Sequence, residues 1–149
     1  MQQLRSFLRS DRFREIFVYG IVGVLTTIIN YCVYWAASRG LAPVFGVAPD
    51  HGAMILAAKI IAWVAAVAFA FWANKIYVFH SADWSGRTLK RELPGFVSAR
   101  VLSLVFDAAF VELTVHLLGM NDMIATLISN VIVILLNYFA SKFWIFKKR

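Results

Sequence analysis

Two charged side chains, Arg100 and Asp107, lie within an otherwise apolar stretch of the sequence that runs from Phe96 to Leu118. Helical periodicity places them two turns apart on one face. Such a stretch can cross a bilayer, because about 20 helical residues span a hydrocarbon core of roughly 30 Å. A charge inside that core costs about 2.5–3.5 kcal/mol even on the scale derived from membrane insertion. We therefore interpret this face as a functional surface that contacts a polar solute.

Four long apolar segments make up most of the chain, and the charged face belongs to the third. The 149 residues are 61% hydrophobic and 15% charged, whereas a soluble domain is nearer half apolar and a quarter charged. The segments do not alternate apolar and polar residues, as the strands of an outer-membrane barrel would. We therefore predict an all-α integral membrane protein, a single domain of residues 1–149, with transmembrane helices at 17–37, 53–78, 96–118 and 123–145.

Basic residues are concentrated at alternate ends of these segments. They precede the first segment, lie between the second and third, and follow the fourth, while the two other connections hold only Arg39. Because cytoplasmic loops are enriched in Lys and Arg, both termini and the middle connection are predicted to be cytoplasmic. The net charge of +7 therefore reflects topology, and we expect no nucleic-acid partner. Residues 1–16 predict a basic interfacial helix, with a tail that serves only topology as the alternative.

The two halves of the sequence resemble each other, which predicts two helical hairpins that enter the membrane the same way, as a parallel repeat. Transport sites in such architectures tend to lie at the interface of the repeats. The second and fourth segments share an ending, since residues 73–79 read ANKIYVF and residues 140–146 read ASKFWIF. The first and third segments match at identical spacing, with Gly23, Thr26 and Asn30 in the positions of Arg100, Ser103 and Asp107.

Several short motifs occur in a fixed order along the chain: Val22-Gly23, Thr26-Thr27 and Asn30-Tyr31, then the Asn-Lys-x-aromatic-x-Phe ending, Phe96 with Arg100, and Asn137-Tyr138 before the Ser-Lys ending. This ordered set resembles the GtrA-like family of small four-helix membrane proteins over nearly the whole chain. The resemblance implies translocation of a monosaccharide linked to a polyisoprenyl phosphate such as undecaprenyl phosphate. The sugar would move from the cytoplasmic to the outer leaflet of the bacterial cytoplasmic (inner) membrane, for cell-surface polysaccharide synthesis.

A phosphate on such a lipid needs cations at headgroup depth. The repeat places Lys75 and Lys142 at the cytoplasmic ends of the second and fourth segments, with Arg100 about one turn inside the third. Arg can clamp a phosphate with paired hydrogen bonds, and Lys offers a mobile point charge. We predict that these three cations form a phosphate cradle, with Asn74 and Ser141, which precede the two lysines, as further substrate contacts. Lysines that only anchor the helix ends at the interface are the alternative.

The sugar needs hydrogen-bonding groups part-way across the membrane. Asp107, its repeat mate Asn30, and Asn137 are predicted near mid-depth. Carboxylates and amides suit a hydroxyl-rich ligand because they offer several acceptor sites. We therefore predict Asp107, Asn30 and Asn137 as sugar contacts, with polar contacts between helices as the alternative. The halves are not equivalent, because Ala70 takes the position of Asn137 in the first half.

A second polar group is predicted nearer the outer surface. Lys59 and Glu112 lie at equal depth in the second and third segments and can pair, which lowers the cost of both charges. His116 follows Glu112 by one helical turn and shares its face. We consider the pair as a hypothetical outer gate that opens when substrate passes, and a purely structural ion pair as the alternative.

The sequence has no nucleotide-binding loop, metal-ligand cluster or nucleophile–base arrangement that stands out. We therefore predict a transporter rather than an enzyme, with no catalytic residue, cofactor or metal. Four helices make a thin wall around a sugar, so we expect a homo-oligomer, most simply a dimer, among membrane lipids. One alternative is a small multidrug-type proton antiporter, although that class uses an acid in its first helix where this chain has Asn30. The other is a non-transporting membrane partner of a glycosyltransferase.

Overall fold

The computed structural model describes residues 11–46, 48, 51–81 and 83–146, and every regular element in this part of the chain is helical. Four spans are long and apolar enough to cross a membrane, so the predicted fold class, an all-α protein with four transmembrane helices, is confirmed. The helices are α2 (Asp11–Phe45), α3 (Gly52–Ala73), α4 (Gly86–Leu118) and α5 (Asp122–Ala140), and α3 and α5 continue into the short π-helices η1 (Asn74–Val78) and η2 (Ser141–Ile145).

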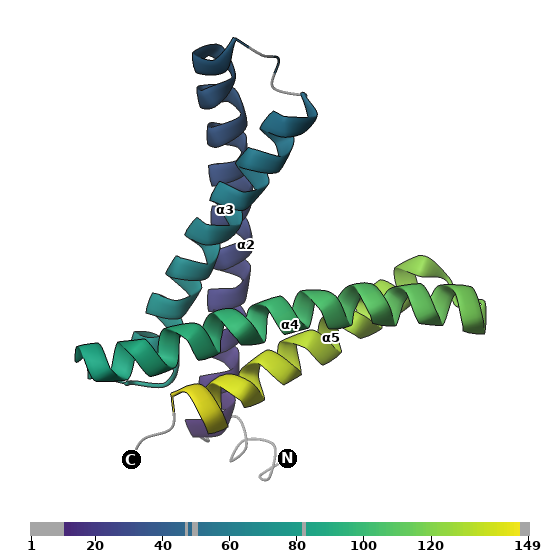
Figure 1. Ribbon diagram of the computed structural model, residues 1–149. Coiled ribbons are helices and arrows are strands. Elements are labelled where there is room, and N and C mark those ends of the chain that lie inside the picture. Colours follow the sequence, from purple (N-terminus) through teal and green to yellow (C-terminus); the bar gives the residue numbers. More distant parts are fainter. Residues whose placement is uncertain (1–10, 47, 49–50, 82, 147–149) are drawn as a thin grey trace. The chain divides into compact units, whose positions relative to one another are not determined.

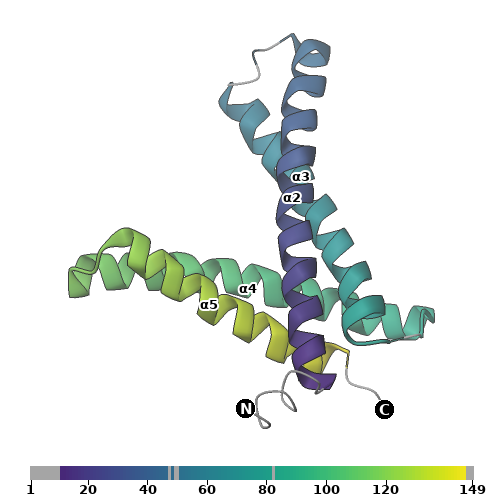
Figure 2. The same cartoon turned by 180° about the vertical axis from the view of Figure 1, so that it is seen from behind.

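The chain divides into two compact units, Met1–His80 and Ser81–Arg149. In the first unit α2 and α3 lie side by side as a hairpin, and in the second unit α4 and α5 do the same (Figure 1, and from behind in Figure 2). Each unit is therefore a helical hairpin whose second helix ends in a π-helix. The division falls where the sequence predicts that the first half ends and the second begins.

The helices extend beyond the apolar segments from which they were predicted. Helix α2 covers Asp11–Phe45 although the first segment was predicted only at 17–37, and α4 begins at Gly86 although the third segment was predicted from Phe96. Hydropathy marks the part of a helix that lies in the hydrocarbon core, whereas its backbone hydrogen bonds continue into the headgroup region. Residues 1–10 of the predicted interfacial segment 1–16 lie outside the described residues, and residues 11–16 belong to α2.

The connection between α4 and α5 is short because both helix ends are capped. Gly119 ends α4 in the left-handed conformation, with φ 62°, which glycine adopts without steric cost. Met120 N–H then donates to Thr114 O at 3.2 Å. Asn121 caps α5, because its Oδ1 accepts from Met123 N–H at 3.0 Å. These caps turn the chain back at once, so that side chains of α4 and α5 face each other.

Small residues line the contact between the two helices of each unit. Small side chains let membrane helices approach closely, and large apolar side chains remain exposed on the outer faces, as a lipid environment requires. The buried small residues recur every four positions: Ala58, Ala62, Ala66 and Ala70 in α3, and Ala125 and Ser129 in α5.

Candidate functional site

The two motifs that end the repeats fold into the same uncommon structure. In the π-helices η1 and η2 an amide bonds to the carbonyl five residues earlier. Phe79 N–H donates to Asn74 O at 2.9 Å, and Phe146 N–H donates to Ser141 O at 2.8 Å. Such turns are rare and occur frequently at functional sites. The predicted repeat therefore extends to the backbone hydrogen bonds that hold the predicted site residues.

In the first unit, Asn74 and Lys75 are both 0% exposed. Asn74 Nδ2 donates to Ala70 O at 2.7 Å. Its buried Oδ1 accepts no hydrogen bond in the described part of the chain. Nearly all buried polar atoms in native proteins have a partner, since leaving one unpaired costs about 1–3 kcal/mol. Asn74 Oδ1 is therefore a buried acceptor without a partner among the described residues, and the role of Asn74 as a substrate contact stays a prediction.

The π-helix of the second unit places its side chains differently. Ser141, at the position of Asn74, is buried, but Lys142 is only half-buried. Lys142 Nζ donates to Tyr138 Oη at 2.9 Å and lies 5.3 Å from the centroid of the same ring. Lys142 can therefore be reached by an anion from outside the unit, whereas Lys75 is enclosed.

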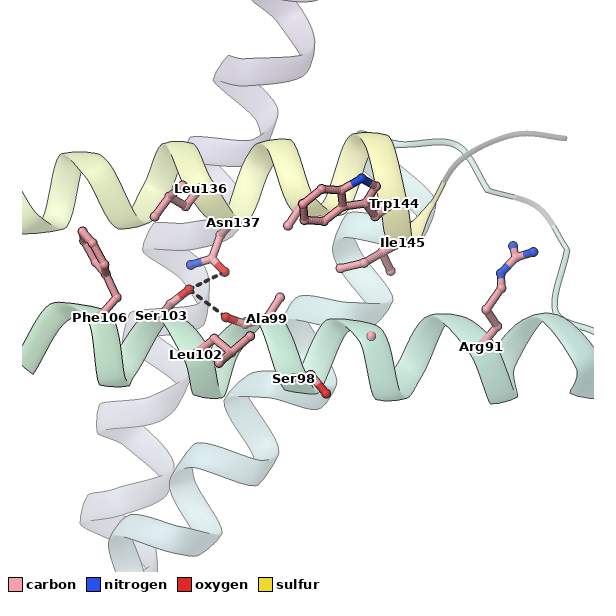
Figure 3. A pocket seen from close by; sticks show the side chains of 12 residues that line it. Arg91, Ser98, Ala99, Leu102, Ser103, Phe106, Leu136, Asn137, Trp144 and Ile145 are labelled. Carbon is pink, nitrogen blue, oxygen red and sulfur yellow. Dashed lines mark hydrogen bonds between the residues drawn. The ribbon is translucent and has the colours of Figure 1, made fainter.

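A groove runs between α4 and the α5–η2 helix of the second unit, with a volume of about 420 Å³ (Figure 3). This size is typical of a small-molecule site. Figure 3 shows Arg91 at one end, Phe106 at the other, and the polar pair Ser103 and Asn137 between them. The residues that line this second-unit groove are Arg91, Gly95, Ser98, Ala99, Leu102, Ser103, Phe106, Leu136, Asn137, Ala140, Trp144 and Ile145.

Asn137 has unused hydrogen-bonding capacity in this mostly apolar groove. The Ser103 hydroxyl is within donating distance of both Asn137 Oδ1, at 2.9 Å, and Ala99 O, at 2.7 Å. The Nδ2 hydrogens of Asn137 meet no acceptor among the described residues, although the side chain is only 4% exposed. These N–H groups can donate hydrogen bonds to a hydroxyl or phosphate oxygen in the groove.

Asp107 joins the two helices of the second unit outside the lining of the groove. Ser129 Oγ donates to Asp107 Oδ1 at 2.6 Å, and Ser129 is fully buried. Within the described residues, Asp107 Oδ2 accepts no hydrogen bond. One carboxylate oxygen therefore holds α4 to α5, while the other can still accept from a sugar hydroxyl.

Arg100, the other charge of the predicted face, lies against an aromatic ring. Its guanidinium carbon is 5.0 Å from the centroid of Phe96. In the described part of the chain Arg100 makes no ion pair with Asp107, as expected from a separation of about 10 Å along the helix. A cation–π contact of this kind is worth about 0.5–1 kcal/mol where exposed, and it leaves the guanidinium N–H groups available.

The sequence matches a known family over most of its length: residues 18–146 fit the model described as GtrA/DPMS, transmembrane domain. The chain belongs to this family. It is similar to the cell wall teichoic acid glycosylation protein GtcA of Listeria innocua, with 36% identity over 94% of this chain and 90% of the relative. The GtcA of Listeria monocytogenes is 35% identical over 99% of this chain and 98% of the relative. No solved structure matches the chain.

In this GtrA/DPMS family member, the predicted outer polar group is exposed. Glu112 Oε1 lies 3.2 Å from His116 Nε2, with side-chain exposures of 72% and 69%, so these residues share a face as expected. Lys59 is also exposed, but it belongs to the first unit, and its pairing with Glu112 stays a prediction. Asn30 is half-buried, and its role as a sugar contact stays a prediction as well.

Two residues of this candidate site were missed from the sequence. Ser129 gave no sign of its partner, because its hydrogen bond spans 22 residues. Arg91 was counted only as a topology determinant, yet it lines the mouth of the second-unit groove. Its side chain is 51% exposed, with Nη2 3.8 Å from Oε1 of the buried Glu92. The repeat held a signal, since Arg14-Glu15 stands before Thr26 at the spacing of Arg91-Glu92 before Ser103.

Proposed function

We propose that the protein is a flippase that moves a polyisoprenyl-phosphate-linked monosaccharide from the cytoplasmic to the outer leaflet, for cell-surface polysaccharide synthesis or glycosylation. Membership of the GtrA/DPMS family supports this, and so do relatives named for cell wall teichoic acid glycosylation. The proposed activity is transport in a bacterial cytoplasmic membrane. It breaks no covalent bond and therefore needs neither a catalytic residue nor a cofactor.

The observation that carries the proposal is the second-unit groove with the buried amide of Asn137. A hydroxyl taken into an apolar medium without a partner costs about 2–7 kcal/mol. The Asn137 Nδ2 donors and the Asp107 Oδ2 acceptor can replace water around the sugar. The polar head, unlike the prenyl chain, is the part of the ligand for which lipid offers no hydrogen-bonding partner.

The phosphate is captured, in this proposal, near the predicted cytoplasmic helix ends. Lys142 is half-buried there beside Ser141, and Arg100 keeps N–H groups available beside Phe96. Lys75 and Asn74 form the equivalent turn of the first unit, in which the buried Asn74 Oδ1 accepts no hydrogen bond among the described residues. A homodimer completes the proposal, because four helices alone enclose little space around a sugar.

Transport measured in liposomes tests the role of Asn137. The purified protein is reconstituted with a fluorescent undecaprenyl-phosphate sugar, and the label that becomes accessible at the opposite leaflet is followed over time. Asn137→Leu keeps the side-chain size but removes the donors. Asn130→Leu is the matched control, since Asn130 lies on the same helix and is exposed. We expect Asn137→Leu to slow flipping by about tenfold or more, because about 1.4 kcal/mol of lost stabilisation is tenfold in rate.

The same experiment separates the flippase from a non-transporting partner of a glycosyltransferase, which the names of the relatives also fit. A well-folded protein that moves no labelled lipid would favour the partner. Equal flipping by the Asn137→Leu and Asn130→Leu variants would contradict the assignment of the groove.

A further inference from the structure

Each unit has a cavity at the same place in the repeat. The first-unit pocket has a volume of about 180 Å³ and lies between the beginning of α2 and η1. Four of its lining residues, Arg14, Val18, Tyr77 and Val78, correspond by the repeat to Arg91, Gly95, Trp144 and Ile145, which line the second-unit groove.

Matching hydrogen bonds support this alignment of the two units. Thr26 Oγ1 donates to Val22 O at 2.7 Å in the first unit. Ser103 Oγ, at the same spacing after Arg91, lies 2.7 Å from Ala99 O in the second. Arg14 and Arg91 therefore occupy equivalent positions in the repeat. Each lies near the beginning of the first helix of its unit and lines a cavity to which the π-helix at the end of the second helix also contributes.

The residues that line the long groove differ from their repeat mates in the first unit at several positions, and two of these differences bear on the shape and polarity of the groove. Gly95 stands where the first unit has Val18, and Asn137 stands where it has Ala70. A Cβ atom added at Gly95 would lie 3.6 Å from Ile145 Cγ1, which is an ordinary contact distance. A branched side chain at this position would occupy the mouth of the groove. The second-unit groove is therefore open beside Gly95, whereas the side chain of Val18 lines the first-unit pocket at the equivalent position.

The lining of the second-unit groove has one charged end, and beyond it the lining is mostly apolar, with Ser98, Ser103 and Asn137 as its polar residues. Arg91 is half-exposed, and its Nη2 lies 3.8 Å from Glu92 Oε1. A guanidinium has five N–H donors in a fixed fork, so most of them remain for an anion and match the oxygens of a phosphate. Beyond Arg91 the groove continues for about 22 Å along α4 to Phe106, at 1.5 Å per residue. This charge distribution matches a lipid chain that carries a phosphate at one end.

We infer that the second-unit groove binds the lipid phosphate of the substrate, with Arg91 as the phosphate contact and the prenyl chain along Leu102 and Phe106. Gly95 leaves room for the prenyl chain, whereas the first-unit pocket, which Val18 lines, binds no prenyl chain. The inference rests on the proposed function, which supplies a ligand that has both a phosphate and a chain. The pair Ser103 and Asn137 lies further along the same groove, and in this inference the polar head reaches it only as the prenyl chain withdraws from Leu102 and Phe106.

A pair of arginine variants tests the phosphate contact. Undecaprenyl phosphate is titrated into the purified full-length protein, and the bound fraction is measured by native mass spectrometry. Arg91→Gln should raise Kd at least about tenfold, the equivalent of about 1.4 kcal/mol. Arg14→Gln removes the equivalent charge from the first unit and should change Kd by less than about twofold. Equal effects of the two variants, or none from Arg91→Gln, would overturn the inference.

Two glycine variants test the path of the chain. Gly95→Ala adds one methyl group at an ordinary contact distance and should preserve binding. Gly95→Val fills the mouth and should raise Kd at least about tenfold, and an unchanged unfolding midpoint shows that the variant is folded. Wild-type affinity in Gly95→Val would place the chain elsewhere. Phosphatidylglycerol serves as a competitor, and displacement at equal concentration would make the groove a general phospholipid site, which also overturns the inference.

Binding and flipping can fail separately. A wild-type protein that binds undecaprenyl phosphate through Arg91 and Gly95 but moves no lipid-linked sugar would refute the flippase and leave the groove as a lipid site. A wild-type protein that flips normally, together with Arg91→Gln and Gly95→Val variants that bind normally, would refute the groove and leave the flippase.

Discussion

The two units share one order of elements but differ in the contact between their helices. In α3 this contact is an alanine stripe, whereas at the repeat positions of Ala62 and Ala70 helix α5 has Ser129 and Asn137. The first unit shows that alanines suffice to pack such a hairpin. A hydrogen bond between membrane helices is worth about 0.6 kcal/mol on average, less than the cost of an intramembrane carboxylate. The polar groups of the second unit therefore point to a function other than packing.

The largest difference between the units is expected at Asp107 and its repeat mate Asn30. Asp107→Leu should lower the rate of flipping by roughly 10- to 100-fold, because a hydrogen bond to a charged group is worth about 1.5–3 kcal/mol. Asn30→Leu should lower it by only about threefold, since a neutral hydrogen bond is worth about 1 kcal/mol or less. The liposome assay gives both rates.

Thermal unfolding in detergent provides the control for these two variants. Ser129 can return its hydroxyl to a carbonyl of its own helix when Asp107 is replaced, so the unfolding midpoint should change little. Equal loss of transport in Asp107→Leu and Asn30→Leu would mean that the two units contribute alike to transport, which would contradict the expected difference between them.

The alanine stripe of the first unit predicts a second effect, on stability. Ala62→Leu adds volume to a closely packed contact and should lower the free energy of unfolding by about 1–3 kcal/mol. Ala68→Leu, on the exposed side of the same helix, should leave it unchanged. A shift in the midpoint of thermal unfolding in detergent distinguishes them. If both variants unfold alike, the stripe is not what holds α2 to α3.

The four helices could be predicted from hydropathy and charge, because both properties depend only on the composition of each segment. The repeat predicted which residues share a position, including Lys75 with Lys142. The π-helices were beyond prediction, because a register shift from the fourth to the fifth carbonyl leaves no separate mark on the pattern ANKIYVF. The same limit explains why Lys75 was predicted as a phosphate contact at headgroup depth and is fully buried, since burial depends on neighbours that are distant in the sequence.

Arg91 and Ser129 were missed for different physical reasons. A basic residue before an apolar segment satisfies the positive-inside rule by itself, which hides any second role. A single serine among apolar residues often hydrogen-bonds within its own helix, so the sequence does not reveal the carboxylate of Asp107. Asn137 was predicted as a sugar contact from its position near mid-depth and the hydrogen-bonding capacity of its amide, and it lines the second-unit groove.

The helix contact of the second unit predicts a smaller effect at Ser129. Ser129→Ala removes the hydrogen bond to Asp107 Oδ1 and makes the residue like Ala62 of the first unit. We expect a loss of about 0.6 kcal/mol in the free energy of unfolding, the average for such bonds in membranes. Double-mutant cycles with Asp107→Leu, which removes the acceptor, measure the coupling directly. Zero coupling would show that the contact contributes nothing to stability, and Ser129 would then serve only to orient the carboxylate.

The smallest effect is expected at Glu112, where the side chain is exposed beside His116. Glu112→Gln should change the free energy of unfolding by less than about 0.5 kcal/mol, since exposed ion pairs contribute little. Transport provides a separate test of the predicted Lys59–Glu112 gate. Reversal of either charge should slow flipping by about threefold, and the double reversal Lys59→Glu with Glu112→Lys should restore it, because a true pair is non-additive. Additive losses would refute the pair. The exposed charge of Glu112 on α4 would then be compensated by water or lipid headgroups. The asymmetry between the units would be confined to the groove and to Asp107.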